Sequence, residues 1–154
     1  MIAILALIAA AAAPALGQEA DGTIGGKATL VDGDTVKIYG RNFRIFGIDA
    51  PKRGEPGFGT LAEFMRAAAE KGPFFCDVVD KERNEPEVAV CWMRVDFVSE
   101  DLAESLLERG LVKTHPGYRR MRPSLIAWYE EVEAQARKRC RGLWRGLPEC
   151  RGHE

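Results

Sequence analysis

Three short runs of alternating apolar and polar residues occupy residues 27–31, 35–39 and 43–48. Alternation with a period of two is typical of a strand that has one buried face. Two turn-forming stretches, Asp32-Gly33-Asp34 and Gly40-Arg41-Asn42, separate the runs. Because Asp-Gly and similar pairs favour tight hairpin turns, the pattern predicts a meander of three strands.

The rest of the chain predicts a helix, two strands and two more helices. Apolar residues recur at helical spacing, and glycine and proline mark the ends of the segments. The expected elements are a helix at 59–71, strands at 74–79 and 87–92, a helix from the N-cap Ser99 to Arg109, and a helix from Pro123 that ends before Gly142. We also expect the three tryptophans, Trp92, Trp128 and Trp144, to lie in the core. Five strands in short meanders with three α-helices are compatible with an α+β fold built on a small OB-type β-barrel.

The start of the chain has the pattern of an export signal. Residues 1–17 carry no charge, and the apolar run at 2–13 is too short to span a bilayer. Small residues at Ala15 and Gly17 suit a signal peptidase, so we expect a mature chain that begins at Gln18 and is secreted or periplasmic. The alternative is an uncleaved anchor, because no basic residue precedes the apolar run.

Composition favours one globular domain, with a charge asymmetry along it. The chain has 154 residues, of which 46% are apolar and 29% are charged. The net charge is −1, yet residues 18–108 contain 11 basic and 18 acidic residues, whereas residues 109–154 contain 11 basic and 5 acidic ones. The last third can therefore attract a polyanion. The alternative is a solvated basic helix end at residues 137–141, where the helix dipole favours cations.

Four cysteines in an exported chain are expected to form disulfides. Four cysteines allow three pairings, but Cys76 and Cys91 fall in strand-like runs that a hairpin can place opposite each other. Cys140 and Cys150 flank a C-terminal segment with glycine and proline, which a second bridge can tie down. A zinc site is the competing interpretation, but the chain has no CxxC motif and its two histidines lack ligand-like spacing.

Two acids and an arginine fall at the ends of the predicted meander strands. Asp34 is the last residue of the first turn, Arg44 lies in the third strand, and Asp49 comes at the end of that strand. These three charges can converge on one phosphate-and-metal site.

Four ordered motifs together resemble the staphylococcal nuclease (thermonuclease) family. They are Val31-Asp32-Gly33-Asp34-Thr35, Phe43-Arg44 through Asp49-Ala50-Pro51, Glu133-Ala134-Gln135-Ala136-Arg137 and Gly142-Leu143-Trp144. The similarity covers about residues 27–144, in the family's order and with near-family spacing. The expected organisation is a signal peptide at 1–17, a short linker at 18–26, a nuclease-like OB-fold domain at 27–146 and a C-terminal tail at 147–154.

The resemblance implies a Ca²⁺-dependent phosphodiesterase that acts on DNA and RNA. The family's metal-ligating acids fall on Asp34 and Asp49, and the Ala50 backbone carbonyl is the expected third protein ligand. Oxygen donors of this kind suit Ca²⁺. The family's first phosphate-binding arginine falls on Arg44, whose planar fork can pair with two phosphate oxygens. Simple turn and cap roles are the alternatives for the two acids.

Two departures from the family pattern put hydrolysis in doubt. The family carries a glutamate directly after the proline of its Asp-x-Pro motif, where this chain has Lys52, a cation at neutral pH. The family also supplies a second arginine just before the fifth strand, where this chain has Pro86 and Glu87. The carboxylate of Glu87 is expected to repel phosphate.

Four other residues are candidates for parts of the site. Glu55, in a glycine-rich loop, can replace the missing carboxylate, and Arg83 is the nearest substitute for the second arginine. Lys81 and Tyr118 are candidate substrate-binding residues, with Tyr118 offset from a family tyrosine that lines the substrate site. Core packing or an idle loop position is the alternative for Tyr118.

Two hypotheses follow for the function of the chain. The first is an exported nuclease with an altered site and weak or lost hydrolysis. The second is a non-catalytic module with the same fold, binding nucleic acid, another anionic polymer or a protein partner. The retained acids and Arg44 favour the first, whereas Lys52 and Glu87 favour the second. We expect a monomer in either case.

Overall fold

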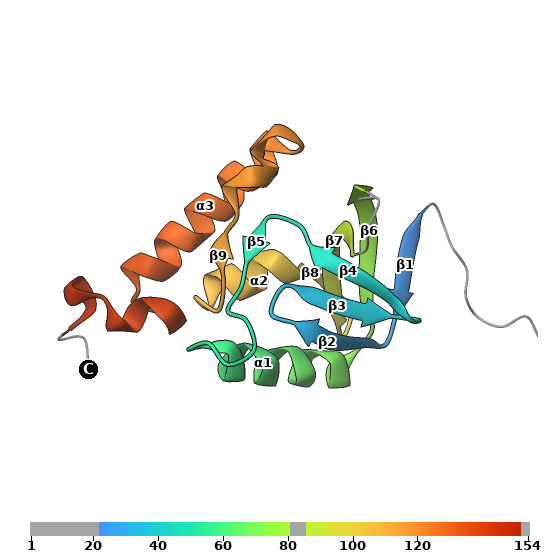
Figure 1. The fold of residues 1–154 in the computed structure, drawn as a ribbon, viewed down its shortest axis with the longest axis horizontal. Coiled ribbons are helices and arrows are strands. Elements are labelled where there is room, and N and C mark those ends of the chain that lie inside the picture. The colour runs from blue at the N-terminus through green and yellow to red at the C-terminus, as the bar shows by residue number, and fades with distance from the viewer. Residues whose placement is uncertain (1–21, 81–85, 152–154) are drawn as a thin grey trace, which may run out of the picture.

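The computed structural model describes residues 22–80 and 86–151. Its strands are β1 (Thr23–Gly26), β2 (Ala28–Asp32), β3 (Thr35–Ile38), β4 (Arg41–Ile45), β5 (Ile48–Asp49), β6 (Phe74–Asp80), β7 (Glu87–Val95), β8 (Val98–Asp101) and β9 (Lys113–Thr114). Its α-helices are α1 (Phe58–Lys71), α2 (Leu102–Glu108) and α3 (Pro123–Lys138), and its 3-10 helices are η1 (Pro116–Arg120), η2 (Gly142–Gly146) and η3 (Pro148–Cys150). Figure 1 shows these elements in chain order.

The strands form a mixed sheet in the order β1-β6-β7-β4-β3-β2, with β8 paired to β7. Neighbouring strands are antiparallel except β4 and β7, which run parallel with Phe43 opposite Glu87. A second, two-stranded ladder joins β5 to β9. The five strands expected from the sequence correspond to β2, β3, β4, β6 and β7. This sheet and the three α-helices confirm the α+β class and are consistent with an OB-like fold.

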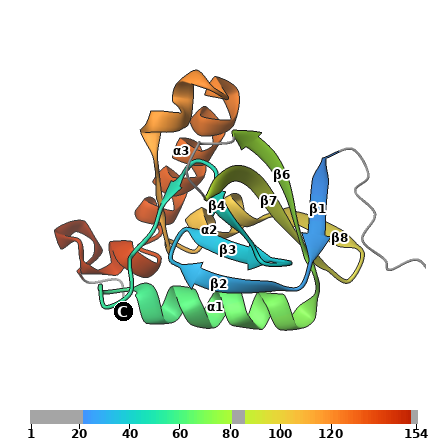
Figure 2. The ribbon, with the colours of Figure 1, turned by 45° about the vertical axis from the view of Figure 1, so that its right-hand side comes forward.

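The helices lie on two sides of the sheet. In Figures 1 and 2, α1 runs along the edge near β2, and it also contacts β7. Helix α2 packs between the sheet and α3, while the C-terminal 3-10 helices follow α3 at the far end of the molecule. The core between these layers includes the fully buried Phe43, Phe46, Leu61, Leu106 and Tyr129.

Two segments outside the expected domain carry regular structure. In the segment predicted as a linker at 18–26, residues 23–26 form β1 and pair with β6. The two glycines of β1 leave it without an alternating apolar and polar pattern, so the sequence did not predict a strand here. In the structure, Gly25 leaves room for the ring of Phe75 on the neighbouring strand. The predicted tail at 147–154 contains η3, and a disulfide ties its Cys150 back to Cys140.

The start of the second helix also differs from the prediction. Ser99 lies within β8, opposite Arg94 of β7, and is not an N-cap. The N-cap is Asp101, whose carboxylate accepts a hydrogen bond of 2.9 Å from the Glu104 N–H. The strand-forming pattern of β7 continues through a hairpin into β8, and this pairing outweighs the local capping signal of Ser99.

Helix α3 buries one face, and Trp128 lies outside it. Its buried residues are Ile126, Tyr129, Val132 and Ala136. Trp128, which we expected in the core, is 50% exposed. Position 128 lies two residues after Ile126 and one before Tyr129, so it falls beside the buried face. Trp144 is buried as expected, and Trp92 is partly buried.

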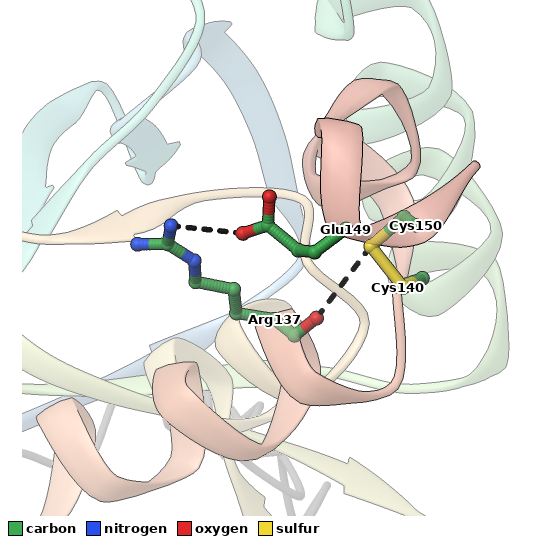
Figure 3. Close-up of a disulfide and its surroundings, with 4 residues drawn as sticks. All are labelled: Arg137, Cys140, Glu149 and Cys150. Carbon is green, nitrogen blue, oxygen red and sulfur yellow. Dashed lines mark hydrogen bonds and ion pairs between the residues drawn. A yellow bond between two sulfur atoms is a disulfide. The ribbon is translucent and has the colours of Figure 1, made fainter.

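Both predicted disulfides are present. Cys76 and Cys91 lie directly opposite each other on β6 and β7, with a Cα–Cα distance of 4.1 Å, and both are buried. Cys140 and Cys150 join the end of α3 to η3, as Figure 3 shows. Beside this second bridge, the Arg137 guanidinium donates to the Glu149 carboxylate over 3.0 Å. Disulfides of this kind are typical of proteins from oxidising compartments.

The signal peptide predicted at residues 1–17 lies outside the described residues. Within the described part of the chain, no helix is long and apolar enough to cross a membrane.

Replacing Asp101 is expected to separate a capping effect from a charge effect. The Tyr129 hydroxyl donates to the second Asp101 oxygen over 2.8 Å, so Asp101→Ala removes a cap and an acceptor together. We expect this variant to lose about 2–4 kcal/mol of the free energy of unfolding. Asp101→Asn keeps one carbonyl oxygen that can accept from the Glu104 N–H, but its amide nitrogen cannot accept from the Tyr129 hydroxyl. We therefore expect Asp101→Asn to lose less stability than Asp101→Ala, about 1 kcal/mol.

The difference in stability between wild type and Asp101→Asn should depend on pH, because Asp101 is buried and can titrate whereas asparagine cannot. Burial raises the pKa of Asp101 above its ordinary value, so the folded state holds this proton more tightly than the unfolded state. The protonated Asp101 carboxyl therefore stabilises the folded state at low pH. This contribution to stability is lost as the pH rises from about 3.9 through the folded-state pKa. Urea unfolding across this window should show Asp101→Asn gaining stability relative to wild type as the pH rises. A constant difference between the two proteins would contradict this assignment.

Candidate functional site

The candidate site lies where the β2–β3 turn, β4 and β5 meet. Asp34 directly precedes β3, and its neighbour Thr35 is the register partner of Arg44 on β4. This pairing brings Arg44 Nε to 3.7 Å from Asp34 Oδ2, with both side chains partly exposed. Two of the three charges that were expected to converge, Asp34 and Arg44, therefore lie close together.

The Asp34 carboxylate and backbone are both held in place. Its Oδ1 accepts a hydrogen bond of 2.8 Å from the Thr35 hydroxyl, and its backbone carbonyl accepts one of 2.8 Å from the Ile45 N–H. The second carboxylate oxygen, Oδ2, faces the Arg44 guanidinium. A carboxylate oriented in this way is positioned before any ligand arrives.

Close packing brings the Asp34 turn against the segment that carries Asp49. A Cβ on Gly33 would lie only 2.1 Å from the Pro51 carbonyl oxygen and 3.0 Å from the Ala50 Cβ. Only glycine allows the two backbones to approach so closely. Asp49 ends β5 and is exposed, and Ala50 follows it as a buried residue. The turn and this segment are therefore adjacent surfaces of one site.

The lysine at position 52 begins a closed turn with Glu55. The Lys52 N–H donates to Glu55 Oε2 over 2.8 Å, and the Glu55 N–H donates to the Lys52 carbonyl over 2.9 Å. The Glu55 carboxylate is thus engaged by backbone within its own turn, while the Lys52 side chain is exposed. The bond uses one carboxylate oxygen, Oε2, and restrains the Glu55 side chain within this turn.

Glu87 is paired with a neighbouring arginine. Its Oε1 accepts hydrogen bonds from Arg41 Nε over 3.0 Å and from Arg41 Nη2 over 2.7 Å. The Glu87 side chain is only 15% exposed. The expectation that this carboxylate repels phosphate is weakened, because the Arg41 guanidinium offsets its charge. The pair also leaves Arg41 engaged on β4, where it covers the Phe43 ring at 5.3 Å.

Comparison with known families identifies the family to which the chain belongs. A family model described as "Staphylococcal nuclease homologue" matches residues 42–146, which include Arg44, Asp49 and the C-terminal Gly-Leu-Trp motif. The chain belongs to the staphylococcal nuclease family. Proteins of this family bind nucleic acids and generally use Ca²⁺. No curated protein matches the chain.

Of the other residues predicted for the nuclease-family site, Tyr118 lies within the described part of the chain. Tyr118, from η1, packs its ring 4.8 Å from the Phe46 ring and 5.2 Å from that of His115, so it is partly buried against the core. Arg83 and Lys81 lie outside the described residues. The structure thus brings Asp34 and Arg44 together beside the Asp49 segment, and holds Glu55 in its turn with Lys52.

A cleft next to Asp49 contains residues that sequence reasoning missed. It has a volume of ≈ 680 Å³, and its lining includes Asp49, Lys52, Glu55, Lys113, Trp144 and Leu147. We call it the Lys52 cleft. Lys113 reaches it from β9, a two-residue strand with no periodic pattern, and Leu147 reaches it from the predicted tail. The basic character of the last third of the chain was the only sequence signal for Lys113.

The donor set suits a hard cation. Among the described residues, no group of three or more histidine, cysteine, aspartate or glutamate side chains is placed to hold a metal ion. The candidate donors are instead two carboxylates, on Asp34 and Asp49, with the Ala50 carbonyl as the third. Oxygen donors with room for water are what Ca²⁺ accepts in proteins. By donor chemistry, the residues present fit Ca²⁺.

Proposed function

We propose that this chain is an exported nucleic-acid-binding member of the staphylococcal nuclease family whose Ca²⁺-dependent phosphodiester hydrolysis is weak or lost. The observation that carries the proposal is the Asp34–Arg44 pair, 3.7 Å apart and packed beside the Asp49–Ala50 segment, with a lysine at position 52. Anion and metal positions are kept, whereas the position expected to activate water holds a cation. The uncharged start and the two disulfides support export.

The protein groups have separate parts in this proposal. Asp34, Asp49 and the Ala50 carbonyl would hold Ca²⁺, which when bound neutralises charge on the phosphate and polarises water. Arg44 binds and orients the phosphate through its planar guanidinium. Lys52 carries no basic lone pair at neutral pH and therefore cannot take a proton from the attacking water.

Two substitutes for the missing groups are weaker candidates. Glu55 has the right chemistry, but its carboxylate accepts the Lys52 N–H and is held in that turn. Arg83 has the right charge for the second phosphate contact, and its placement is not part of the described structure. Loss of a general base typically lowers the rate ~10²–10⁴-fold, so without Glu55 the chain is expected to be a slow nuclease.

A second function is favoured by the same substitutions. The fold with its anion site can serve as a non-catalytic module that binds nucleic acid, another anionic polymer or a protein partner. The Arg41–Glu87 pair supports this alternative, because it fills the β7 end where the family places its second arginine. The two functions differ in turnover rather than in the residues that bind phosphate.

An assay of the mature chain on single-stranded DNA tests the proposal directly. We expect slow cleavage in Ca²⁺, no cleavage in EDTA, and no cleavage by Asp34→Ala. Binding of the same DNA, measured in parallel, distinguishes the two functions. Binding without any turnover would support the non-catalytic module, and rates equal in Ca²⁺ and EDTA would contradict the metal-dependent site.

The packing at Gly33 predicts that a methyl group there disturbs metal binding without removing a ligand. Gly33→Ala would push the Asp34 turn away from Pro51, so we expect weaker Ca²⁺ binding and a loss of ~1–3 kcal/mol in stability. Calorimetric titration with CaCl₂ measures the Ca²⁺ binding. Asp34→Ala is the reference variant, because it should lose the binding event altogether.

Gly59→Ala is the matched control, because a Cβ at this position in α1 meets no atom within 4 Å. It should bind Ca²⁺ as wild type does. Identical titrations of Gly33→Ala and wild type would show that the Asp34 turn and the Asp49 segment do not form one metal site.

A further inference from the structure

The Lys52 cleft joins the candidate metal site to the C-terminal 3-10 helices. Asp49 and Lys52 line one side, and Trp144 and Leu147 line the side formed by η2 and the residue that follows it. The Cys140–Cys150 disulfide and the Arg137–Glu149 ion pair fasten this second side to α3 (Figure 3). The cleft therefore has a covalently anchored wall next to a metal-ligand candidate.

Lys113 is placed in this cleft by the small β5–β9 ladder. It is the direct register partner of Asp49, and residues opposite each other in such a ladder have Cβ atoms about 5 Å apart. Its ammonium nevertheless makes no ion pair with Asp49, and lies 5.5 Å from the Trp144 ring centroid. This cation–π contact with the buried indole holds the Lys113 ammonium next to a residue that lines the cleft.

Lys52, a second lysine, also lines this cleft. Its backbone is fixed by the reciprocal hydrogen bonds with Glu55, so the start of its side chain has a defined position. Neither Lys52 nor Lys113 forms an ion pair with another described residue. Of the two carboxylates in the lining, Glu55 already accepts a backbone N–H, and Asp49 is a proposed Ca²⁺ ligand. Among the described residues, Lys52 and Lys113 thus line the cleft without a carboxylate partner, and Lys113 lies over the Trp144 ring.

These features together indicate an anionic ligand about as large as a nucleotide. Clefts of about 300–1,000 Å³ hold ligands of that size, and this one has a volume of ≈ 680 Å³. Lysine ammonium groups bind phosphate as point charges. The apolar lining from Pro51, Leu143 and Leu147 can cover a sugar or a base next to such a phosphate.

We propose that Lys52 and Lys113 form a phosphate-binding subsite for the nucleotide next to the one bound at Arg44. The inference rests on the proposed function, because it concerns the same nucleic-acid strand. It also assigns a role to the residue that replaces the expected glutamate. With Lys52 in place of a glutamate, the protein binds one more nucleotide of the strand, and its rate of hydrolysis is lower.

Salt-dependent binding of single-stranded DNA tests the subsite. The probe is a short, fluorescein-labelled phosphorothioate oligonucleotide, which resists cleavage, and the readout is fluorescence anisotropy in Ca²⁺ over a range of NaCl concentrations. We expect Lys52→Ala and Lys113→Ala each to weaken binding roughly fivefold. Each should also reduce the slope of log affinity against log salt by ~0.7, the value for one contact to a single-stranded phosphate. Lys113→Arg should retain both quantities.

Lys71→Ala is the matched control, since this exposed lysine is at the last residue of α1 and does not line the cleft. Its affinity and salt slope should equal those of wild type, and equal losses in all three alanine variants would overturn the subsite in favour of a general charge effect. If Arg44→Ala abolishes binding while Lys52→Ala and Lys113→Ala do not change it, the subsite is wrong and the proposed function stands. If folded wild-type protein binds no DNA, the proposed function and the subsite both fail. Thermal unfolding of each variant confirms that it is folded.

Discussion

Replacing Lys52 with glutamate is expected to raise the rate of DNA hydrolysis toward the lower end of the ~10²–10⁴-fold range that a general base contributes. The new carboxylate would stand next to the proposed Ca²⁺ ligands and could orient and deprotonate the attacking water. The exchange leaves the local backbone intact, because the bond from position 52 to Glu55 is made by the main-chain N–H. If the Lys52–Lys113 subsite is correct, KM should rise while kcat rises.

The gain should depend on the groups that bind phosphate and metal. Asp34→Ala or Arg44→Ala, combined with Lys52→Glu, should abolish the activity, because positioning is lost even when a base is present. Adding Pro86→Arg to Lys52→Glu should exceed the single change, since arginine would return to the start of β7. Steady-state cleavage of single-stranded DNA in Ca²⁺ measures each rate.

Lys71→Glu provides the control for charge alone. It makes the same change of charge at the end of α1 and should leave the rate unaltered. If neither Lys52→Glu nor the double variant cleaves DNA above an EDTA blank while remaining folded, the site has degenerated beyond these two positions. The non-catalytic module would then be the correct function.

Removing the Cys76–Cys91 bridge is expected to have the largest effect on stability. The bridge spans 15 residues, for which loop closure contributes about 3 kcal/mol. Both cysteines are buried between β6 and β7, so a Cys76→Ala/Cys91→Ala variant also loses packing in the core. Denaturant unfolding of this variant should show a loss of about 3–5 kcal/mol.

The C-terminal bridge is the natural comparison for this measurement. Cys140→Ala/Cys150→Ala opens a loop of 10 residues at the edge of the fold, and its loss of stability should be smaller. It should instead alter DNA binding through the wall of the Lys52 cleft. An unfolding midpoint that is unchanged for Cys76→Ala/Cys91→Ala would contradict the structural role of the first bridge.

The parts of the fold that could be predicted from the sequence are those with local patterns. The meander of β2, β3 and β4 follows from alternating residues and two turns, and α1 follows from apolar residues at helical spacing. The meeting of Asp34 with Arg44 was predictable for the same reason, because it needs only the β3–β4 hairpin.

The parts that could not be predicted depend on pairing across long separations. The Glu87–Arg41 ion pair joins residues 46 positions apart, and no local pattern marks either as a partner. Lys113 enters the Lys52 cleft through a two-residue ladder, and β1 is rich in glycine, so neither element has a period to detect. Serine is favoured at helix N-caps, but the pairing of β7 with β8 places Ser99 in a strand instead.

The parallel pairing of β4 with β7 has a consequence for the order of folding. The β2–β3–β4 meander closes short loops, so the Asp34–Arg44 pair can form early. Pairing Phe43 with Glu87 closes a long loop that contains helix α1 and strand β6. Contacts between residues so far apart in sequence slow the folding transition. The proposed phosphate-binding residue Arg44 therefore belongs to the part of the chain that assembles locally, and the Arg41–Glu87 pair is made only when β4 and β7 have come together.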